Sequence, residues 1–528
     1  MKQLLTCIIA GAVALFSVSQ IMPPAQKLRL AEGVIENYYV DTVNADHVVE
    51  EAIKAMISTL DPHSSYSTPE ETKALTEPLD GNFSGIGIQF NMMQDTLYVL
   101  SVIAGGPSER VGIRPGDRIT MANDTAIAGV KMPNTTVMKH LRGPKGTPVE
   151  VKVVRRGEKE PLTFRIIRDD IPIYSIDAAY MADPTTGYVR ISRFAAETPA
   201  EFDEAVRKLR TEGMKNLIID VEDNGGGYLE AAQQLASRFL DKGDLIVYTE
   251  APRLPRFSYN ATERGDLRDG RVVVMANQYS ASASEILAGA LQDNDRGLVV
   301  GRRTFGKGLV QRPFPFPDGS MIRLTVSRYY TPAGRCIQKP YTKGDTKDYR
   351  SDIYNRFDHG ELMNADSIEI DRSLVYKTLR NGRTVYGGGG IIPDRFVPID
   401  TTFFTTYYRD LVAKGAFNRY AIGYVDAHRD SLKTAYPDEK QFVGKFEVTP
   451  LMMQGLIDTG KEEGVEYNED QYNVSEAYMR TIVKALIARD LYESGSYFRV
   501  ANELNPVYRE ALDLINDPKR YDRLLSGK

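Results

Sequence analysis

Ser282 and Lys307 are the residues of this sequence whose types and surroundings could carry out a reaction. A serine hydroxyl becomes a nucleophile when a base removes its proton, and a lysine serves as that base once burial lowers its pKa towards neutrality. Lys307 stands between Phe305 and Leu309 in a glycine-bounded loop, a setting that would keep its amine away from water. The pair therefore predicts nucleophilic catalysis by a serine–lysine dyad.

Three apolar runs precede the loops that carry these groups. Residues 217–221, 272–275 and 298–300 have the length and the branched side chains of buried strands, and a helical pattern joins the last two. Parallel strands joined by one helix place the loops at their carboxyl ends on one edge of the sheet. Open α/β sheets bind ligands at that edge. The sequence thus brings the serine turn, the Lys307 loop and the glycine loop 225–227 together.

Each residue also has an ordinary structural explanation. Serines that precede an apolar helical run commonly cap the helix, and Ser280 and Ser284 are interpreted as structural residues. A single loop lysine is ordinarily solvated. The catalytic interpretation of Ser282 and Lys307 depends on their combination with a glycine loop, whose backbone N–H groups could hold a developing oxyanion.

The segments SASASEI and TFGKGLVQ, which contain these two residues, resemble the carboxyl-terminal processing proteases, also called tail-specific proteases. The resemblance implies that Ser282 is the nucleophile, that Lys307 is the general base and that Gln311 hydrogen-bonds the lysine. No cofactor is implied. The cysteines and histidines show no metal-ligand spacing such as His-Glu-x-x-His, so no metal site is predicted.

The glycine loop extends the resemblance and also departs from it. The oxyanion donors would be the backbone N–H groups of Ala283 and of Gly226 or Gly227. Where relatives usually carry Asp-Leu-Arg-Asn-Asn-Pro-Gly-Gly, this chain has Asp-Val-Glu-Asp-Asn-Gly-Gly-Gly, so Glu222 replaces an arginine. This replacement would reverse any ion pair made there. Asp220 is interpreted as a structural carboxylate at the end of a strand.

Residues 81–169 change to the alternating period of strands and resemble a PDZ domain. The segment GGPSERVGIRPGD matches a PDZ helix and the turn after it. A PDZ domain offers backbone N–H groups of a glycine loop to a terminal carboxylate, while the peptide adds a strand to the sheet edge. An ordinary hairpin with paired glycines is the alternative. The residues that match the carboxylate-binding loop are Gly85, Ile86, Gly87 and Ile88.

The chain begins with a pattern typical of export. Residues 1–20 combine a single charge, Lys2, with an apolar run and small residues before Gln20, which predicts a signal peptide and a periplasmic or secreted protein. An uncleaved anchor in the inner membrane is the alternative. Removal of this segment would leave Cys336 as the single cysteine, so no intramolecular disulfide is expected.

A chain of 528 residues is too long for one core and predicts several domains. The resemblance implies a multidomain α/β fold, in which a PDZ domain precedes a serine protease core with a largely parallel, crotonase/ClpP-like sheet. Helical periodicity predicts helical domains at both ends, and residues 345–385, charged and without a clear period, are interpreted as an insertion in the core. The expected helical, PDZ, core and second helical domains are 21–80, 81–169, 170–400 and 401–528.

These patterns together predict a serine endopeptidase that recognises protein substrates by apolar carboxyl-terminal tails. The PDZ domain would bind the tail, gate the active site, or do both. Two alternatives remain open, namely a non-catalytic PDZ-type scaffold and an esterase or amidase. The net charge of −5 argues against nucleic acid as the main partner. An activating or adaptor protein, an oligomer and proximity to a membrane are compatible with the sequence.

Overall fold

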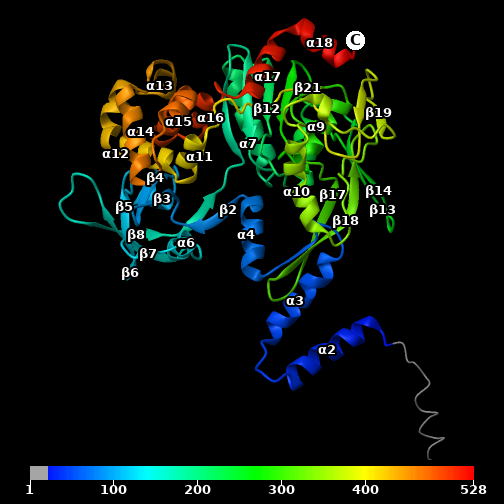
Figure 1. The fold of residues 1–528 in the computed structure, drawn as a ribbon, viewed down its shortest axis with the longest axis horizontal. Coiled ribbons are helices and arrows are strands. Elements are labelled where there is room, and N and C mark those ends of the chain that lie inside the picture. Colours follow the sequence, from blue (N-terminus) through cyan, green and yellow to red (C-terminus); the bar gives the residue numbers. More distant parts are fainter. Residues whose placement is uncertain (1–21) are drawn as a thin grey trace, which may run out of the picture.

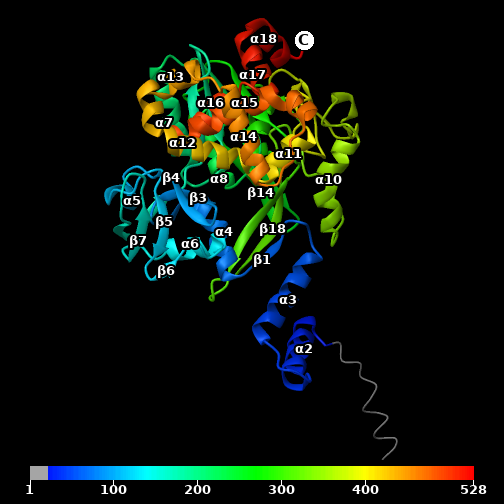
Figure 2. The ribbon, with the colours of Figure 1, turned by 60° about the vertical axis from the view of Figure 1, so that its left-hand side comes forward.

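The computed structural model describes residues 22–528, and the predicted signal peptide, residues 1–20, lies outside them. The first helices project away from the rest of the molecule in both views (Figures 1 and 2). No helix among the described residues is long and apolar enough to cross a membrane. In chain order the first elements are α2 (Pro24–Tyr38), α3 (Ala45–Ser58), β1 (Ser65–Ser67) and α4 (Pro69–Asp80).

Residues 82–172 form a β-rich unit whose two ends are paired. Strand β2 (Asn82–Gly85) runs antiparallel to β9 (Asp169–Pro172), so the chain enters and leaves the unit at one place. Every second residue of β7 is fully buried, as expected for a sheet with one face on a core. The sheet order β3-β4-β5-β7-β8 leaves β3 at an open edge. The other elements are β3 (Ile88–Met93), β4 (Thr96–Val102), α5 (Pro107–Arg110), β5 (Arg118–Ala122), β6 (Thr125–Ala126), α6 (Asn134–Leu141), β7 (Pro148–Val154) and β8 (Leu162–Ile167).

A six-stranded sheet organises the predicted protease core. Its strands pair in the order β10-β11-β12-β15-β16-β21, and every pair except β10 with β11 is parallel. The three apolar runs of the sequence are β12, β15 and β16, buried along their whole length because helices cover both faces. The strands are β10 (Ile176–Met181), β11 (Thr186–Ile191), β12 (Asn216–Asp220), β15 (Val272–Ala276), β16 (Leu298–Gly301) and β21 (Arg395–Phe396).

The two faces of this sheet are covered by helices from different parts of the chain. Ile219 and Val274 point into a core shared with α7 (Thr198–Thr211), α8 (Leu229–Ser237) and α9 (Ala283–Asp293). The residues that alternate with them pack against the last two helices of the chain. Those helices are α17 (Pro506–Asn516) and α18 (Pro518–Ser526), at the top of Figure 1.

A second sheet, antiparallel, stands beside the first. Its order is β1-β18-β13-β14, with β17 also paired to β18, so the amino-terminal segment contributes a strand to it. The predicted insertion follows β18 and holds one helix, a short 3-10 turn and a hairpin. The elements are β13 (Leu245–Ala251), β14 (Leu254–Asn260), β17 (Leu309–Pro315), β18 (Met321–Tyr330), α10 (Thr346–Asp358), η1 (Ala365–Ser367), β19 (Val375–Lys377) and β20 (Thr384–Tyr386).

The helices that follow β21 differ from our prediction in one respect. We expected residues 401–528 to form one helical domain, but only α11 to α16 share a core of their own. Helices α17 and α18 belong to the protease sheet because the apolar stripe that includes Val507, Leu514 and Ile515 packs on it. The helices with their own core are α11 (Thr406–Ala413), α12 (Ala416–Ala435), α13 (Glu439–Lys445), α14 (Pro450–Glu462), α15 (Glu469–Leu491) and α16 (Ser494–Ala501).

This helical segment also contacts the β-rich unit. Arg118 of β5 forms an ion pair with Asp426 of α12, with Nη2 and Oδ2 2.9 Å apart. The Arg156 guanidinium donates to the backbone carbonyl of Asp426 at 3.0 Å. The β-rich unit is therefore attached to the rest of the chain at α12 as well as at its paired ends.

Candidate active site

Ser282 stands at the amino-terminal end of α9 in an unusual backbone conformation. Its φ of 57° and ψ of −113° lie outside the regions that a residue with a side chain readily adopts. Neighbouring serines have the structural roles that we predicted. Ser280 donates its hydroxyl to the carbonyl of Val221 at 2.7 Å, and Ser284 donates to that of Asn224 at 2.9 Å. Of the three serines, Ser282 alone lines the large cavity of the protease core.

Lys307 lies in the loop between β16 and β17 and lines the same cavity, which has a volume of about 1050 Å³. Burial lowers the pKa of its amine to about 8, and the positive charge of Arg323 acts in the same direction. An amine with this pKa is neutral for a large fraction of the time at slightly alkaline pH. It can therefore accept a proton, as the sequence argument required.

Glu285 joins the serine turn to the lysine loop. Its fully buried carboxylate accepts the backbone N–H of Ser282 at 2.8 Å and that of Lys307 at 2.9 Å. It also accepts the N–H of Gly306 at 2.8 Å and the hydroxyl of Thr304 at 2.6 Å. Burial raises its pKa to about 7, while these bonds act to lower it. We did not predict this residue from the sequence, although the spacing Ser282-x-x-Glu285 is that of a capping box.

The glycine loop approaches the serine turn closely. A Cβ atom on Gly226 would lie 2.7 Å from the Cβ of Ser282, so only glycine fits there. The N–H of Gly226 donates to the side chain of Asn224 at 2.8 Å, which removes it from the two candidate glycine donors. Within residues 22–528, the N–H groups of Gly227 and Ala283 make no hydrogen bond. Those two groups are therefore the better candidates for oxyanion donors.

Gln311 also lines the cavity, but its side-chain amide donates elsewhere. The Nε2 atom donates to the carbonyl of Leu309 at 3.2 Å and to the hydroxyl of Thr325 at 3.1 Å. Thr325 in turn donates to the carboxylate of Asp61 at 2.9 Å. The predicted bond between Gln311 and Lys307 is not among these contacts, and the role of Gln311 towards the lysine stays a prediction.

The amino-terminal segment reaches the site through His63 as well. Its Nε2 atom forms a hydrogen bond with the hydroxyl of Tyr349 at 2.8 Å. Burial and the nearby Lys307 lower the pKa of His63 to about 3, so the ring stays neutral. It adds no positive charge beside the lysine.

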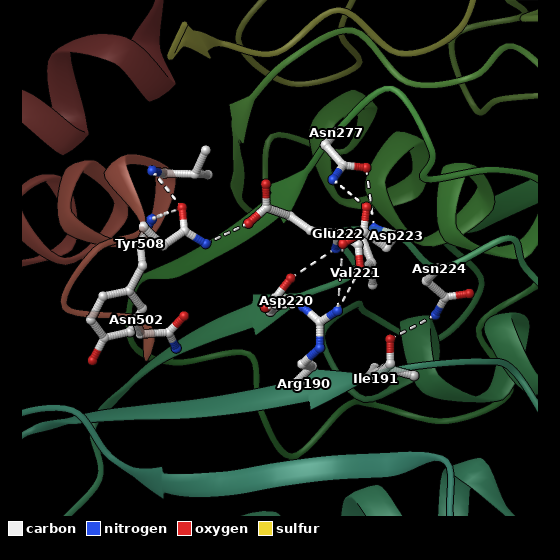
Figure 3. A network of polar contacts seen from close by, with 12 residues as sticks. Arg190, Ile191, Asp220, Val221, Glu222, Asp223, Asn224, Asn277, Asn502 and Tyr508 are labelled. Atoms are coloured by element: carbon white, nitrogen blue, oxygen red, sulfur yellow. Dashed lines mark hydrogen bonds and ion pairs between the residues drawn. The ribbon is translucent and has the colours of Figure 1, made fainter. Parts of the chain in front are cut away.

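Glu222 takes part in the reversed ion pair that the sequence led us to expect. Its buried carboxylate faces the guanidinium of Arg302 at 3.5 Å and accepts from the side chain of Asn505 at 2.8 Å. Burial raises the pKa of Glu222 to about 7. Asp220 has the structural role that we assigned to it, since it accepts from Arg190 at 2.6 Å and from the N–H of Glu222 at 2.8 Å (Figure 3).

The predicted peptide-binding loop lies between β2 and β3, the strand at the open sheet edge. Gly87 has a φ of +75°, which favours glycine, and Ile86 is buried in the core of the unit. Arg142, after α6, donates to Glu77 of α4 at 2.7 Å, and α4 also lines the cavity. The β-rich unit therefore touches an element of the candidate active site.

No group of three or more His, Cys, Asp or Glu side chains in the described part of the chain could hold a metal ion. The residues that surround the cavity form a site built from a hydroxyl, an amine and backbone N–H groups. Such a set supports acyl transfer, in which a serine attacks a carbonyl and the N–H groups hold the oxyanion.

Comparisons with known proteins agree with the resemblance in the sequence. A model of peptidase family S41 matches residues 185–348, and a model of the PDZ domain matches 84–166. Residues 407–493 match a family of unknown function, DUF8443. The PDZ and S41 matches confirm the two principal domain types, whereas the crotonase/ClpP-like character of the core stays a prediction.

Curated relatives and solved structures extend this comparison. The carboxy-terminal processing protease CtpB of Bacillus subtilis (strain 168) is 34% identical over 348 residues, which is 65% of this chain and 71% of the relative. A carboxy-terminal-processing protease of Bartonella bacilliformis is 34% identical over 309 residues, 58% of this chain and 70% of the relative. A solved photosystem II D1 C-terminal processing protease is 31% identical and covers 59% of this chain and 83% of its own, with a TM-score of 0.34. The chain therefore belongs to the carboxy-terminal processing proteases of peptidase family S41.

Proposed function

We propose that this protease is a serine endopeptidase in which Ser282 and Lys307 form the catalytic dyad. The observation that carries the proposal is the position of Glu285, whose carboxylate binds the backbone N–H groups of both residues. Both residues line one cavity, and the pKa of Lys307 is lowered to about 8. A serine that only caps a helix, beside a solvated lysine, would account for neither the shared cavity nor the lowered pKa of the lysine.

The reaction begins when the neutral amine of Lys307 takes the proton of the Ser282 hydroxyl. The alkoxide oxygen attacks the carbonyl carbon of the peptide, and the N–H groups of Ala283 and Gly227 hold the oxyanion of the tetrahedral intermediate. The protonated lysine then gives its proton to the leaving amine, and the C–N bond breaks. Water, deprotonated by the same lysine, hydrolyses the acyl-enzyme and restores the serine.

Substrate recognition is proposed to combine the PDZ unit with the cavity. The terminal carboxylate of a tail would bind the loop from Gly85 to Ile88, and the tail would pair with the open edge of β3. The cavity wall, which an unfolded segment would cross, is mostly apolar. The apolar side chains on it include Leu75, Leu79, Phe257, Met321, Val326 and Tyr329.

The proposal is tested with the purified chain on an unstructured protein that ends in apolar residues. Ser282→Ala and Lys307→Ala should each abolish cleavage, while Ser431→Ala and Lys242→Ala, at exposed positions outside the cavity, should cleave as the wild type does. Cleavage that survives Ser282→Ala would refute the dyad. Binding of the tail by the wild type without cleavage would favour a peptide-binding scaffold.

Tail recognition is tested separately by changing the substrate and the PDZ unit. A charged or amidated tail should slow cleavage relative to the apolar free tail. Because β2 and β9 pair, residues 84–169 can be replaced by a short turn without separating the flanking segments. Unchanged rate and selectivity in this variant would contradict a role of the PDZ unit in recognition or gating.

A further inference from the structure

Arg323 of β18 lines the same cavity as Ser282 and Lys307. In the antiparallel pair of β17 and β18 it stands opposite Pro313, one step along the strand face from the pair of Gln311 and Thr325. Its side chain therefore lies on the face of β18 that looks into the cavity. The charge of its guanidinium reaches Lys307, whose pKa it helps to lower.

This guanidinium lacks the partner that a buried charge ordinarily has. Within residues 22–528, no carboxylate lies within 4.0 Å of it, no hydrogen bond from its side chain is formed, and its Nε atom is buried without an acceptor. Burial lowers the pKa of Arg323, and no acidic group opposes this effect. Other buried arginines have acceptors: Arg335 pairs with Asp293 and Arg356 with Glu361, whereas Arg168 donates to backbone carbonyls.

Leaving a partly buried cation without an acceptor costs free energy, which an anionic ligand would recover. The acidic residues on the cavity wall, Glu230 and Glu250, lie on other elements and do not pair with Arg323. A role limited to lowering the pKa of Lys307 would explain the positive charge. It would not explain why a planar fork of donors faces the space that the substrate must occupy.

We infer that Arg323 forms a subsite that binds a carboxylate of the peptide substrate, close to the bond that Ser282 attacks. This inference rests on the proposed function and defines the substrate class more narrowly, as apolar segments that carry one acidic group near the scissile bond. The carboxylate has two sources, an Asp or Glu side chain of the segment and the α-carboxylate of a chain that ends just beyond the cleaved bond. Both would form charge-assisted hydrogen bonds to the guanidinium.

The experiment compares how fast the full-length protein cleaves matched peptide substrates. Mass spectrometry first locates the bond cleaved in an unstructured apolar segment, and peptides are then made with Glu, Gln or Lys at each position near it. The wild type should cleave one Glu peptide about tenfold faster than its Gln counterpart in kcat/KM, as a charge-assisted hydrogen bond allows. Shortened peptides with free and amidated ends form a second arm. Faster cleavage of the shortened peptides with a free end than of the amidated ones assigns the subsite to the α-carboxylate.

The variants separate the subsite from the effect of Arg323 on the lysine. In Arg323→Gln the ratio of kcat/KM for the Glu peptide to that for the Gln peptide should fall to about one. In Arg323→Glu the Lys peptide should become the preferred substrate. Loss of the positive charge also raises the pKa of Lys307 and slows all peptides, so ratios are compared at pH 9. Arg328→Gln, at an exposed position of the same strand, should keep the wild-type ratio.

Two outcomes would overturn different claims. An equal ratio for wild type and Arg323→Gln, with both peptides cleaved, overturns the subsite and leaves the dyad intact. No cleavage of any peptide by the wild type overturns the proposed function itself. If Arg323→Gln has no activity, binding of the Glu and Gln peptides to Ser282→Ala and to Ser282→Ala/Arg323→Gln decides, because only the first should prefer Glu.

Discussion

At the scale of single residues, the environment of Lys307 determines its chemistry. An exposed lysine keeps a pKa near 10.4 and is protonated at neutral pH, whereas burial and Arg323 bring the pKa of this one to about 8. The sequence could predict the direction of this change from the apolar neighbours of the lysine. It could not predict the contribution of Arg323, because that contact depends on the pairing of β17 with β18.

The lowered pKa sets the expected pH dependence of the reaction. Only the neutral lysine accepts the serine proton, so kcat/KM should rise about tenfold per pH unit below about pH 8 and level off above it. Lys307→Arg should have no activity at any of these pH values, because a guanidinium stays protonated. The measurement is a profile of kcat/KM from pH 6.5 to 9.5. An inflection near pH 10 would contradict the role assigned to burial.

The buried pair of Glu222 and Arg302 is a second case in which the charge of one residue depends on that of its neighbour. Glu222→Arg would place two guanidinium groups in a buried site and should destabilise the protein by about 3–5 kcal/mol. Adding Arg302→Glu should recover part of this loss but not all, because Asn505 would still lack its acceptor. Thermal unfolding at pH 8 keeps Glu222 ionised. A double variant no more stable than Glu222→Arg would exclude the ion pair as the cause.

At the scale of elements, the position of the dyad depends on how helix α9 meets the loop before β17. The sequence predicted the strands correctly, because β12, β15 and β16 are buried on both faces and appear as uninterrupted apolar runs. It did not reveal Glu285 as a link, because most of the partners of this carboxylate are backbone N–H groups, which leave no mark in a sequence. Nor could the sequence show that the backbone N–H of Gly226 donates a hydrogen bond to the side chain of Asn224.

Glu285 should therefore act as a positioning residue whose loss affects catalysis more than binding. Glu285→Gln replaces one acceptor oxygen by a donor that would face N–H groups. We expect kcat to fall by about ten- to a hundredfold while KM changes little, as for other residues that orient reacting groups. Glu369→Gln, at an exposed position of the insertion, serves as the control. A rise in KM with unchanged kcat would show that Glu285 shapes the substrate site instead.

At the scale of the whole molecule, segments that are distant in the chain meet around the cavity. Asp61 accepts from Thr325, and α4 contributes to the cavity wall, so α4 and the turn before β1 belong to the surroundings of the site. The helical segment that matches DUF8443 contacts the PDZ unit through Asp426. Periodicity predicted these helices but carried no information about which unit each would touch.

The contact at Asp426 should restrain the PDZ unit. Asp426→Asn removes the charge that pairs with Arg118, and the two side chains are mostly shielded from water. We expect faster hydrogen exchange at the facing parts of α12 and β5, with a change of at most about 1 kcal/mol in the free energy of unfolding. Asp430→Asn, one turn further along α12 and exposed, is the control. Equal hydrogen exchange in both variants would show that the remaining contacts hold the PDZ unit without the ion pair.

The placement of α17 and α18 also bears on how the protein is made. These two helices follow every strand of the sheet in chain order, yet they cover one face of the sheet that carries the proposed dyad. Until they emerge, the apolar side chains of β15 and β16 on that face stay open to water, so the sheet cannot be completed during synthesis. A chain whose synthesis stops before α17 would therefore have no stable active site, although every residue of the proposed dyad had been made.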